Sequence, residues 1–127
     1  MSIQTVKVNN IPISGPYSQA IKANGFIFVS GCIPQNPQTH QIIKGNIKEA
    51  TKLALTNLES VLKAGNSELT KIVKVNIYLS DMSLYHDVNQ VYEEVIETPF
   101  PARTTVAVKD LPMSVDLEIE AIALYQN

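Results

Sequence analysis

The sequence predicts a single α+β domain, in which a mixed β-sheet carries two helices on one of its faces. Two patterns support this prediction: short stretches of branched residues that alternate every second position, and two amphipathic segments with a period near 3.6 residues. In chain order they give β-β-β-α-β-α-β-β. A chain of 127 residues is long enough for one core and too short for two ordinary domains, so residues 1–127 are assigned to one domain.

The N-terminal third is predicted to form three strands and a long loop. Asn24-Gly25 is typical of a two-residue hairpin turn, so the segments on either side of it should pair. The segment after the turn is a continuous apolar run and is expected to be a fully buried strand. Pro34 and Pro37 exclude regular structure from the segment that follows. The elements expected here are strands over residues 3–8, 17–21 and 26–30, and a loop over residues 34–44.

Capping residues and apolar faces mark the two helices. Asn46 and Glu49 have the spacing of a capping box and predict the start of a helix that ends at Gly65-Asn66. Ser83 is expected to cap the second helix, which Pro99 terminates. The apolar faces are Ile47, Ala50, Ala54, Leu58, Val61 and Leu62 in the first helix, Leu84, Val88, Val91, Tyr92 and Val95 in the second, and Val73, Val75, Ile77 and Leu79 in the strand between them.

Two amphipathic helices are too few to cover both faces of a sheet of this size. We therefore expect the helices to pack on one face. The other face needs a different cover, and a second subunit is the simplest candidate.

The last quarter of the chain carries charges that a simple sheet does not explain. Residues 100–108 and 117–125 are both predicted strands, separated by a polar segment that contains a proline. Arg103 lies at the start of the first strand, and Glu118 and Glu120 share one face of the second. One interpretation is a structural ion pair between Arg103 and one of the glutamates. The other is functional: an arginine that binds a ligand carboxylate bidentately, and a glutamate that positions or deprotonates a water.

Composition argues against several classes of function. The net charge of −2, the pI of about 5.6 and the lack of a basic run argue against nucleic acid as the main partner. The apolar stretches are strand-sized and the N-terminus lacks a targeting pattern, so we expect a cytoplasmic protein that does not span a membrane. His40, His86 and Cys32 lack partners at ligand spacing, so no metal site is expected. Cys32 follows an apolar strand, where a cysteine is usually an inert small hydrophobe.

Six segments spread along the whole chain form a recognisable set. They are Gly15-Pro16-Tyr17-Ser18-Gln19-Ala20, Phe28-Val29-Ser30-Gly31-Cys32-Ile33-Pro34, Val73-Lys74-Val75-Asn76-Ile77-Tyr78-Leu79, Asn89-Gln90-Val91-Tyr92, Pro101-Ala102-Arg103 and Glu118-Ile119-Glu120-Ala121-Ile122-Ala123. With these segments the chain resembles the reactive intermediate deaminase (Rid) family, also called the YjgF family.

The resemblance implies a chorismate-mutase-like fold, assembled as a homotrimer whose sheets form a central barrel and whose sites lie between adjacent subunits. It also implies hydrolysis of short 2-imino acids, such as 2-iminobutanoate and 2-iminopropanoate, which pyridoxal-phosphate enzymes release. The products are 2-keto acids and ammonia, and neither cofactor nor metal is needed. Alternatives within the family are a regulatory protein that binds small carboxylates, and a ribonuclease or translation inhibitor. A mitochondrial location also stays open.

Roles for the charged residues follow from the same resemblance. Arg103 would hold the substrate carboxylate, and Glu118 would position the attacking water with Glu120 in support. Thr105 stands where many members have a cysteine whose backbone amide faces the ligand, and Cys32 stands where glutamine is common. The threonine still supplies the amide, so activity is expected to survive.

Four further residues would shape the pocket. Tyr17 would line it from a loop, Ser30 and Gly31 would form its floor, and Asn89 would lie near its wall.

Overall fold

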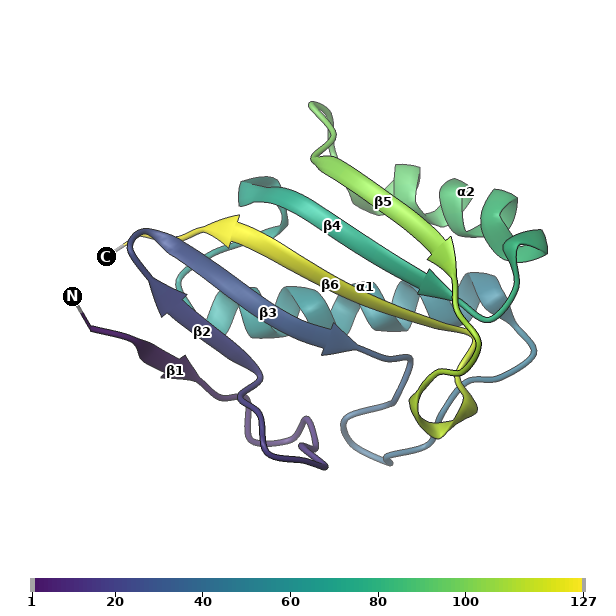
Figure 1. Cartoon of the computed structure of the whole chain (residues 1–127), viewed down its shortest axis with the longest axis horizontal. Helices are drawn as coiled ribbons and strands as arrows, with labels where there is room; N and C mark the ends of the chain where they lie inside the picture. The colour runs from purple at the N-terminus through teal and green to yellow at the C-terminus, as the bar shows by residue number, and fades with distance from the viewer. Residues whose placement is uncertain (1, 127) are drawn as a thin grey trace.

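The computed structural model describes residues 2–126 and has the predicted order of strands and helices. One mixed sheet runs in the order β1-β2-β3-β6-β4-β5, and both helices lie against the same face of it (Figure 1). The predicted fold class is therefore confirmed. The elements are β1 (Gln4–Val6), β2 (Ala20–Ala23), β3 (Phe26–Cys32), α1 (Ile47–Ala64), β4 (Ile72–Leu79), α2 (Tyr85–Val95), β5 (Ala102–Ala107) and β6 (Leu117–Leu124), with 3₁₀ turns at Leu69–Lys71, Met82–Leu84 and Pro112–Ser114.

The last strand in sequence lies in the middle of the sheet. β6 pairs antiparallel with β3 on one side and with β4 on the other, and β4 pairs in parallel with β5. This order places the two glutamates of β6 next to the end of β3. It also places Arg103 on β5, which is an edge strand, with β4 between them.

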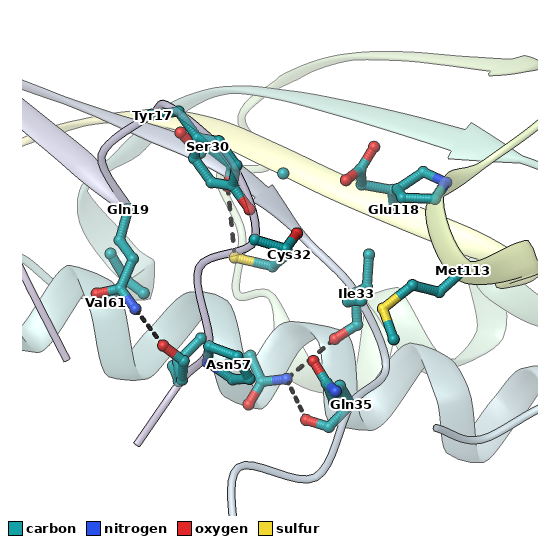
Figure 2. Close-up of a pocket in the computed structure, with 15 residues that line it drawn as sticks. Tyr17, Gln19, Ser30, Cys32, Ile33, Gln35, Asn57, Val61, Met113 and Glu118 are labelled. Carbon is teal, nitrogen blue, oxygen red and sulfur yellow. Dashed lines mark hydrogen bonds between the residues drawn. The ribbon is translucent and has the colours of Figure 1, made fainter. Parts of the chain in front are cut away.

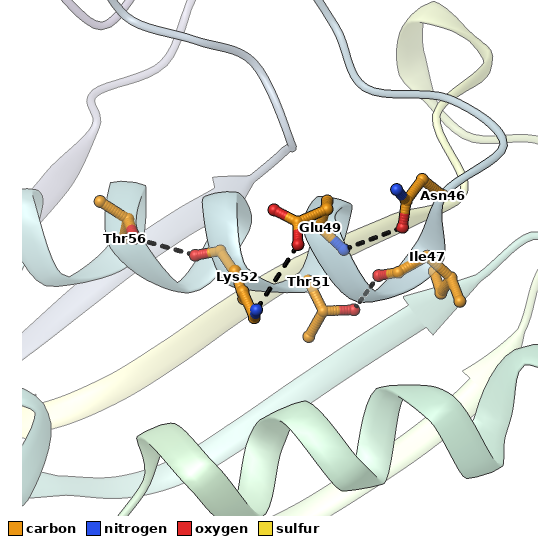
Figure 3. A network of polar contacts seen from close by, with 6 residues as sticks. All are labelled: Asn46, Ile47, Glu49, Thr51, Lys52 and Thr56. Carbon is orange, nitrogen blue, oxygen red and sulfur yellow. Dashed lines mark hydrogen bonds and ion pairs between the residues drawn. The ribbon is translucent and has the colours of Figure 1, made fainter.

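The start of α1 shows the Asn46 half of the predicted capping box, while the Glu49 side chain pairs with Lys52 rather than with the Asn46 backbone (Figure 3). Asn46 Oδ1 accepts a hydrogen bond from the Glu49 backbone N–H at 3.3 Å, which satisfies one of the unpaired donors of the first turn. Glu49 forms an ion pair with Lys52 at 3.5 Å. The Thr51 hydroxyl donates back to the Ile47 carbonyl at 2.7 Å within the same turn.

The end of α1 is fixed by packing as well as by backbone conformation. Asn66 has the predicted left-handed conformation, with φ of 64°, whereas Gly65 has φ of −98°. Gly65 is needed for a different reason: a Cβ there would lie 2.4 Å from Ile27 Cδ1 on β3. The glycine lets the helix end approach the sheet closely.

The core fills the layer between the helices and the sheet. Its largest fully buried side chains come from α1, α2 and the inner faces of β3, β4 and β6. They are Ile27, Leu55, Leu58, Leu62, Ile77, Leu79, Leu117, Ile119, Val61, Val75, Val88 and Val91.

The second predicted strand begins later than expected. Residues 17–19 belong to a loop, and β2 starts at Ala20. The reason is that the side chain of Gln19 is buried and forms hydrogen bonds with the backbone of the preceding loop. Gln19 therefore belongs to that loop and not to the strand. Its Nε2 donates to the carbonyls of Val8 at 3.1 Å and Ile11 at 2.7 Å, and its Oε1 accepts from the Val8 N–H. The loop that carries Tyr17 is anchored in this way.

Two predictions about buried strand faces are wrong. β3 is buried on one side only, because Phe26 and Phe28 point away from the helices and are 37% and 44% exposed. On β4 a register shift between Ile72 and Lys74 places Ile72 in the core and leaves Val73 40% exposed. An apolar run does not distinguish a strand buried on both faces from one whose outer face is left open.

The start of α2 also differs from the prediction. Ser83 does not cap it; its backbone N–H donates to Asp81 Oδ1 at 2.8 Å, and a 3₁₀ turn leads into the helix at Tyr85. The helix ends at Val95, before Pro99. Of its predicted apolar face, Val88, Val91 and Tyr92 are buried. The 3₁₀ turn brings Tyr85 onto the helical face that contacts β5.

The sheet face opposite the helices is open in this chain. Strand register places two kinds of side chain there: an apolar group over β3, the end of β6 and β5, and a polar group over the middle of β4 and β6. The apolar group is Phe26, Phe28, Ile122, Leu124 and Val106, and the polar group is Lys74, Asn76, Tyr78, Glu118 and Glu120. A cover by a second subunit remains a prediction.

Candidate functional site

With the exception of Thr105, the catalytic and substrate-binding residues predicted from the sequence line two separate cavities. The first, of about 170 Å³, lies at the end of β3 and is lined by Tyr17, Ser30, Gly31 and Glu118 (Figure 2). We call it the Glu118 cavity. The second, of about 220 Å³, lies between α2 and β5 and is lined by residues that include Asn89, Tyr92, Phe100 and Arg103. We call it the Arg103 cavity.

Thr105 lines neither cavity. It follows Arg103 on the same face of β5. Its buried Oγ1 has no hydrogen-bond partner within residues 2–126.

A β-bulge shapes the Glu118 cavity. The register of β3 against β6 shifts between Val29 and Cys32, so Ser30 and Gly31 lie opposite a single residue of β6. The Ser30 hydroxyl donates to the Ser18 carbonyl at 2.6 Å, which holds the bulge against the loop. A Cβ at Gly31 would lie 2.4 Å from Glu118 Oε2. Gly31 therefore makes the space that the Glu118 carboxylate occupies.

The two glutamates of β6 have different environments. Glu120 Oε2 accepts hydrogen bonds from Asn76 Nδ2 and from the Tyr78 hydroxyl, both at 3.0 Å. Within the described residues Glu118 has no such side-chain donor. Burial, and then the nearby Glu120 carboxylate, raise the pKa of Glu118 above its ordinary value of 4.5. Glu118 is thus the carboxylate whose acceptor capacity is unused, and a raised pKa suits a base.

Cys32 contributes shape to the cavity and no reactive thiolate. Burial, and then the Glu118 charge, raise the pKa of the thiol to about 12, so it stays protonated near neutral pH. Its Sγ contacts the Ser30 carbonyl at 3.5 Å. This agrees with the expectation of an inert cysteine.

Arg103 is held by neutral groups. Its Nη2 donates to Asn89 Oδ1 at 2.7 Å and to the Tyr85 hydroxyl at 3.3 Å. Its Cζ lies 4.8 Å from the centroid of the Tyr92 ring, which adds a cation–π contact. Between residues 2 and 126, no carboxylate lies within ion-pair distance of this guanidinium. Arg103 keeps its charge and most of its donors for another partner.

Arg103 and Glu118 point to opposite sides of the sheet. Arg103 is level with Val75 in the parallel β4–β5 pair, so it shares the helix-covered face with that core residue. Glu118 lies between the buried residues Leu117 and Ile119, so it points to the open face. In addition, β4 lies between β5 and β6 and separates these strands by about 10 Å. Of the two interpretations that the sequence left open, the structural ion pair between Arg103 and Glu118 or Glu120 is therefore excluded within this chain's described residues.

Sequence reasoning placed Asn89 near the pocket but missed that it holds Arg103 together with Tyr85 and Tyr92. Tyr85, Asn89 and Tyr92 are spaced four and then three residues apart, which places them on one stripe of α2. That spacing could have predicted that the three side chains lie side by side. The wall formed by Ile33, Pro112 and Met113 was also missed, and no local pattern indicates it because those residues meet only in the folded chain.

The chain belongs to the family described as Endoribonuclease L-PSP, which is the Rid or YjgF family, because that family's profile matches residues 8–125. Mitochondrial protein mmf1 of Schizosaccharomyces pombe is 51% identical over 114 residues, which cover 87% of this chain and 69% of the yeast protein. A protein of Dermatophagoides farinae named 2-iminobutanoate/2-iminopropanoate deaminase is 36% identical over 112 residues, which cover 88% of each chain.

A solved structure agrees with this membership. The structure of E. coli TdcF with bound serine superposes with a TM-score of 0.90 at 30% identity, covering 97% of this chain and 99% of that one. Within residues 2–126, no helix combines the length and apolarity needed to cross a membrane. The same residues contain no cluster of three or more His, Cys, Asp or Glu side chains suited to a metal ion.

Proposed function

We propose that this protein is a 2-iminobutanoate/2-iminopropanoate deaminase whose site is completed between adjacent subunits of a homotrimer. The observation that carries the proposal is the separation of Arg103 and Glu118 on opposite sheet faces, each without an ion-pair partner within residues 2–126. Among the residues that the structure describes, the Glu118 cavity has no arginine or lysine in its lining, and the Arg103 cavity, although Glu93 also lines it, lacks Glu118. Arg103 of one subunit and Glu118 of the next would supply both.

Arg103 binds the substrate carboxylate in this proposal. The guanidinium is a planar fork that matches a carboxylate bidentately, and Asn89 and Tyr85 orient it from one side. Two similarities support an amino-acid-like substrate. TdcF is solved with serine bound, and the mite relative is named as an imine deaminase.

Glu118 acts on the water. Its carboxylate accepts a proton from a water placed over C2 of the imine while the water oxygen forms a bond to C2. With a protonated imine, whose C2–N π electrons move onto nitrogen, this gives a neutral tetrahedral carbinolamine. Its nitrogen then takes the proton from Glu118 and leaves as ammonia, while the C2 hydroxyl passes its proton back to the Glu118 carboxylate and becomes the carbonyl of the 2-keto acid. Ammonia takes that proton and departs as ammonium, which leaves Glu118 ionised again. One water is consumed and no electrons are exchanged. The imine carbon is already electrophilic, so positioning supplies most of the catalysis.

The remaining predicted residues shape the pocket. Tyr17 and the Ser30–Gly31 bulge line the side that carries Glu118. Asn89 orients Arg103 rather than contacting the substrate first. The backbone amide of Thr105, on edge strand β5, donates to the ligand.

The open sheet face supports assembly. Phe28 and Leu124 are exposed there beside Ile122, so a trimer that packs its sheets together would bury apolar surface now facing water. The same packing brings β5 of one subunit near the Glu118 cavity of another. We propose that the trimer acts in the cytoplasm or, as the name of the fission yeast relative suggests, in mitochondria.

Mixing two inactive variants tests the proposal. Arg103→Ala and Glu118→Gln are each expected to lose hydrolysis of the imine formed by threonine dehydratase, followed with semicarbazide as a competing trap. Coexpressed trimers combine an intact Arg103 with an intact Glu118 at about one quarter of their sites, by random assortment around a ring. Roughly a quarter of wild-type activity is expected to return.

The control is the doubly substituted chain coexpressed with wild type, which separates complementation from dilution. If coexpressed single variants stay inactive while gel filtration shows mixed trimers, the shared site is wrong. If wild type leaves semicarbazone formation unchanged, the deaminase is wrong.

A regulatory protein that binds small carboxylates is the second candidate. Serine bound to TdcF favours it, because binding alone needs only the arginine half of the site. It predicts binding of serine or 2-keto acids by calorimetry with no imine hydrolysis. A ribonuclease, suggested by the family's description, would instead cleave RNA and lose little activity in Arg103→Ala.

A further inference from the structure

The Glu118 cavity extends beyond what the smallest imines need. It continues from Glu118 past Cys32 to Asn57 and Val61 on α1, with a volume of about 170 Å³ (Figure 2). A methyl or ethyl side chain would fill only its outer part. Whatever lines the passage from Glu118 into this space selects the substrate side chain.

Met113 is held at that passage by an unusual backbone conformation. Met113 has φ of 56° and ψ of 19°, and Ser114 also has φ of 56°. Residues with a Cβ avoid this left-handed region, and they keep it where the surrounding structure requires it, often near ligands. The turn is closed by hydrogen bonds from the Ser114 N–H to the Leu111 carbonyl at 3.1 Å and from the Val115 N–H to the Pro112 carbonyl at 3.3 Å.

This conformation keeps the apolar side chain of Met113 at the cavity although the side chain is not buried in the core. Met113 is 53% exposed, yet it lines the Glu118 cavity and extends toward Ile33 (Figure 2). The turn that carries Met113 ends at Ser114, four residues before Glu118, and leads directly into β6. The position of Met113 is thereby tied to that of the carboxylate.

The opposite wall is fixed. Asn57 Nδ2 donates to the carbonyls of Ile33 at 3.0 Å and Gln35 at 2.9 Å, which fastens this segment to α1. Methionine has an unbranched, flexible side chain that adapts to what it contacts. The passage therefore has one rigid wall at Ile33 and one adjustable wall at Met113.

We propose that Met113 determines which imine side chains the site accepts. The substrate side chain passes between Ile33 and Met113 toward Cys32, so the space that Met113 leaves sets the length and width of the apolar side chain that the site takes. This inference rests on the proposed deaminase, because it places C2 of the substrate over Glu118. It assigns to Met113 a selecting role and no part in the chemistry.

The test compares kcat/KM for imines that an amino acid oxidase makes from alanine, 2-aminobutanoate, leucine and phenylalanine. Met113→Ala is expected to raise the phenylalanine-to-alanine ratio about tenfold, and Met113→Trp to lower the leucine-to-alanine ratio about tenfold, as for apolar pockets that gain or lose a few carbons. Met113→Leu should keep the wild-type order. Met82→Ala is the matched control: Met82 is 46% exposed in another 3₁₀ turn and lines neither cavity.

Equal changes for all four substrates, or a shift of the same size in Met82→Ala, would overturn the role of Met113. Failure of the deaminase itself has a different signature, because wild type would then hydrolyse none of the imines. In that event calorimetry with the corresponding 2-keto acids decides. A change in side-chain preference in Met113→Ala supports the wall, and an unchanged order or no binding refutes it.

Discussion

The Glu118 cavity and the Arg103 cavity are built in different ways. The first depends on irregular backbone: the bulge at Ser30–Gly31 makes room for the carboxylate, and the left-handed turn at Met113 closes one side. The second depends on regular structure, since one stripe of α2 presents Asn89 and Tyr92 to Arg103 on β5. Glu118 and Met113 thus owe their positions to irregular backbone, whereas the residues around Arg103 owe theirs to the regular period of a helix.

The two cavities also differ in how they treat charge. Glu118 has its pKa raised by burial and by a second carboxylate, so its charged form costs free energy in the folded chain. Arg103 is surrounded by neutral acceptors and aromatic rings that accommodate its charge. The folded chain therefore holds the Glu118 carboxylate at a cost in stability, whereas the groups around Arg103 stabilise its charge. Substitutions at five positions probe this comparison.

The largest effect is expected for Arg103→Ala. Removing the fork takes away two charge-assisted hydrogen bonds to the substrate carboxylate, which together correspond to about a 10²–10⁴-fold loss in kcat/KM. Arg103→Lys keeps the positive charge but lacks the planar fork, so its kcat/KM should lie between those of the wild type and Arg103→Ala. Steady-state kinetics measures the loss, and gel filtration checks that assembly persists. A fully active Arg103→Ala would remove the carboxylate clamp from the mechanism.

Glu118→Gln is expected to lower the rate and stabilise the fold. Loss of a positioned base corresponds to about a 10²–10⁴-fold decrease in kcat. Because the folded pKa of Glu118 is raised, its ionised form is destabilising, and this cost appears as pH rises from the ordinary 4.5 through the raised pKa. The variant should therefore melt higher at pH 7, by roughly 1–3 °C after allowing for solvent screening of a half-buried group, with the gain gone below pH 4.5.

Glu120→Gln provides the matched comparison for that measurement. It weakens the bonds from Asn76 and Tyr78 to a charged acceptor, so its melting temperature at pH 7 should fall. If both variants shift in the same direction, the proposed difference between the two glutamates is incorrect.

Gly31→Ala should have an intermediate effect. The added Cβ would lie 2.4 Å from Glu118 Oε2, so the carboxylate must move while the strand itself stays paired. We expect about a tenfold decrease in kcat with little change in KM, in keeping with the effect of misplacing a catalytic group. In a Glu118→Gln background the same substitution should cost little more, since the group that it displaces is already inactive. Additive losses would show that Gly31 acts independently of Glu118.

The smallest effect is expected on the arginine side, at Thr105. Its Oγ1 is buried without a hydrogen-bond partner within residues 2–126, so Thr105→Val removes an unsatisfied polar atom and keeps the shape. Activity should stay within about threefold for Thr105→Val and Thr105→Cys, because only the backbone amide is proposed to contact the ligand. Thermal melts should show Thr105→Val unchanged or slightly stabilised. A large loss of activity in both variants would assign the hydroxyl itself a role.

Local patterns predicted most of the fold. Asn24-Gly25 specified the hairpin, since both residues have the positive φ that a tight turn of this type requires, and Asn46 specified the start of α1. Two of the misses have a cause in common. At Gln19 and Ile72 a hydrogen bond or a strand register set by another segment replaces the locally expected arrangement. The miss at Ser83 is local, because Asp81, two residues earlier, accepts its backbone N–H.

The sequence alone singled out the residues that are proposed to carry the chemistry: an arginine and two glutamates on strands that are otherwise apolar. Only the tertiary structure decided how they are grouped. Strand order put β4 between Arg103 and the glutamates, strand parity pointed Arg103 and Glu118 to opposite faces, and two hydrogen bonds distinguished Glu120 from Glu118. The alternation along one strand fixes which of its residues share a face. It does not fix which strand lies beside it or which face that neighbour's residues occupy, because pairing between distant segments sets both.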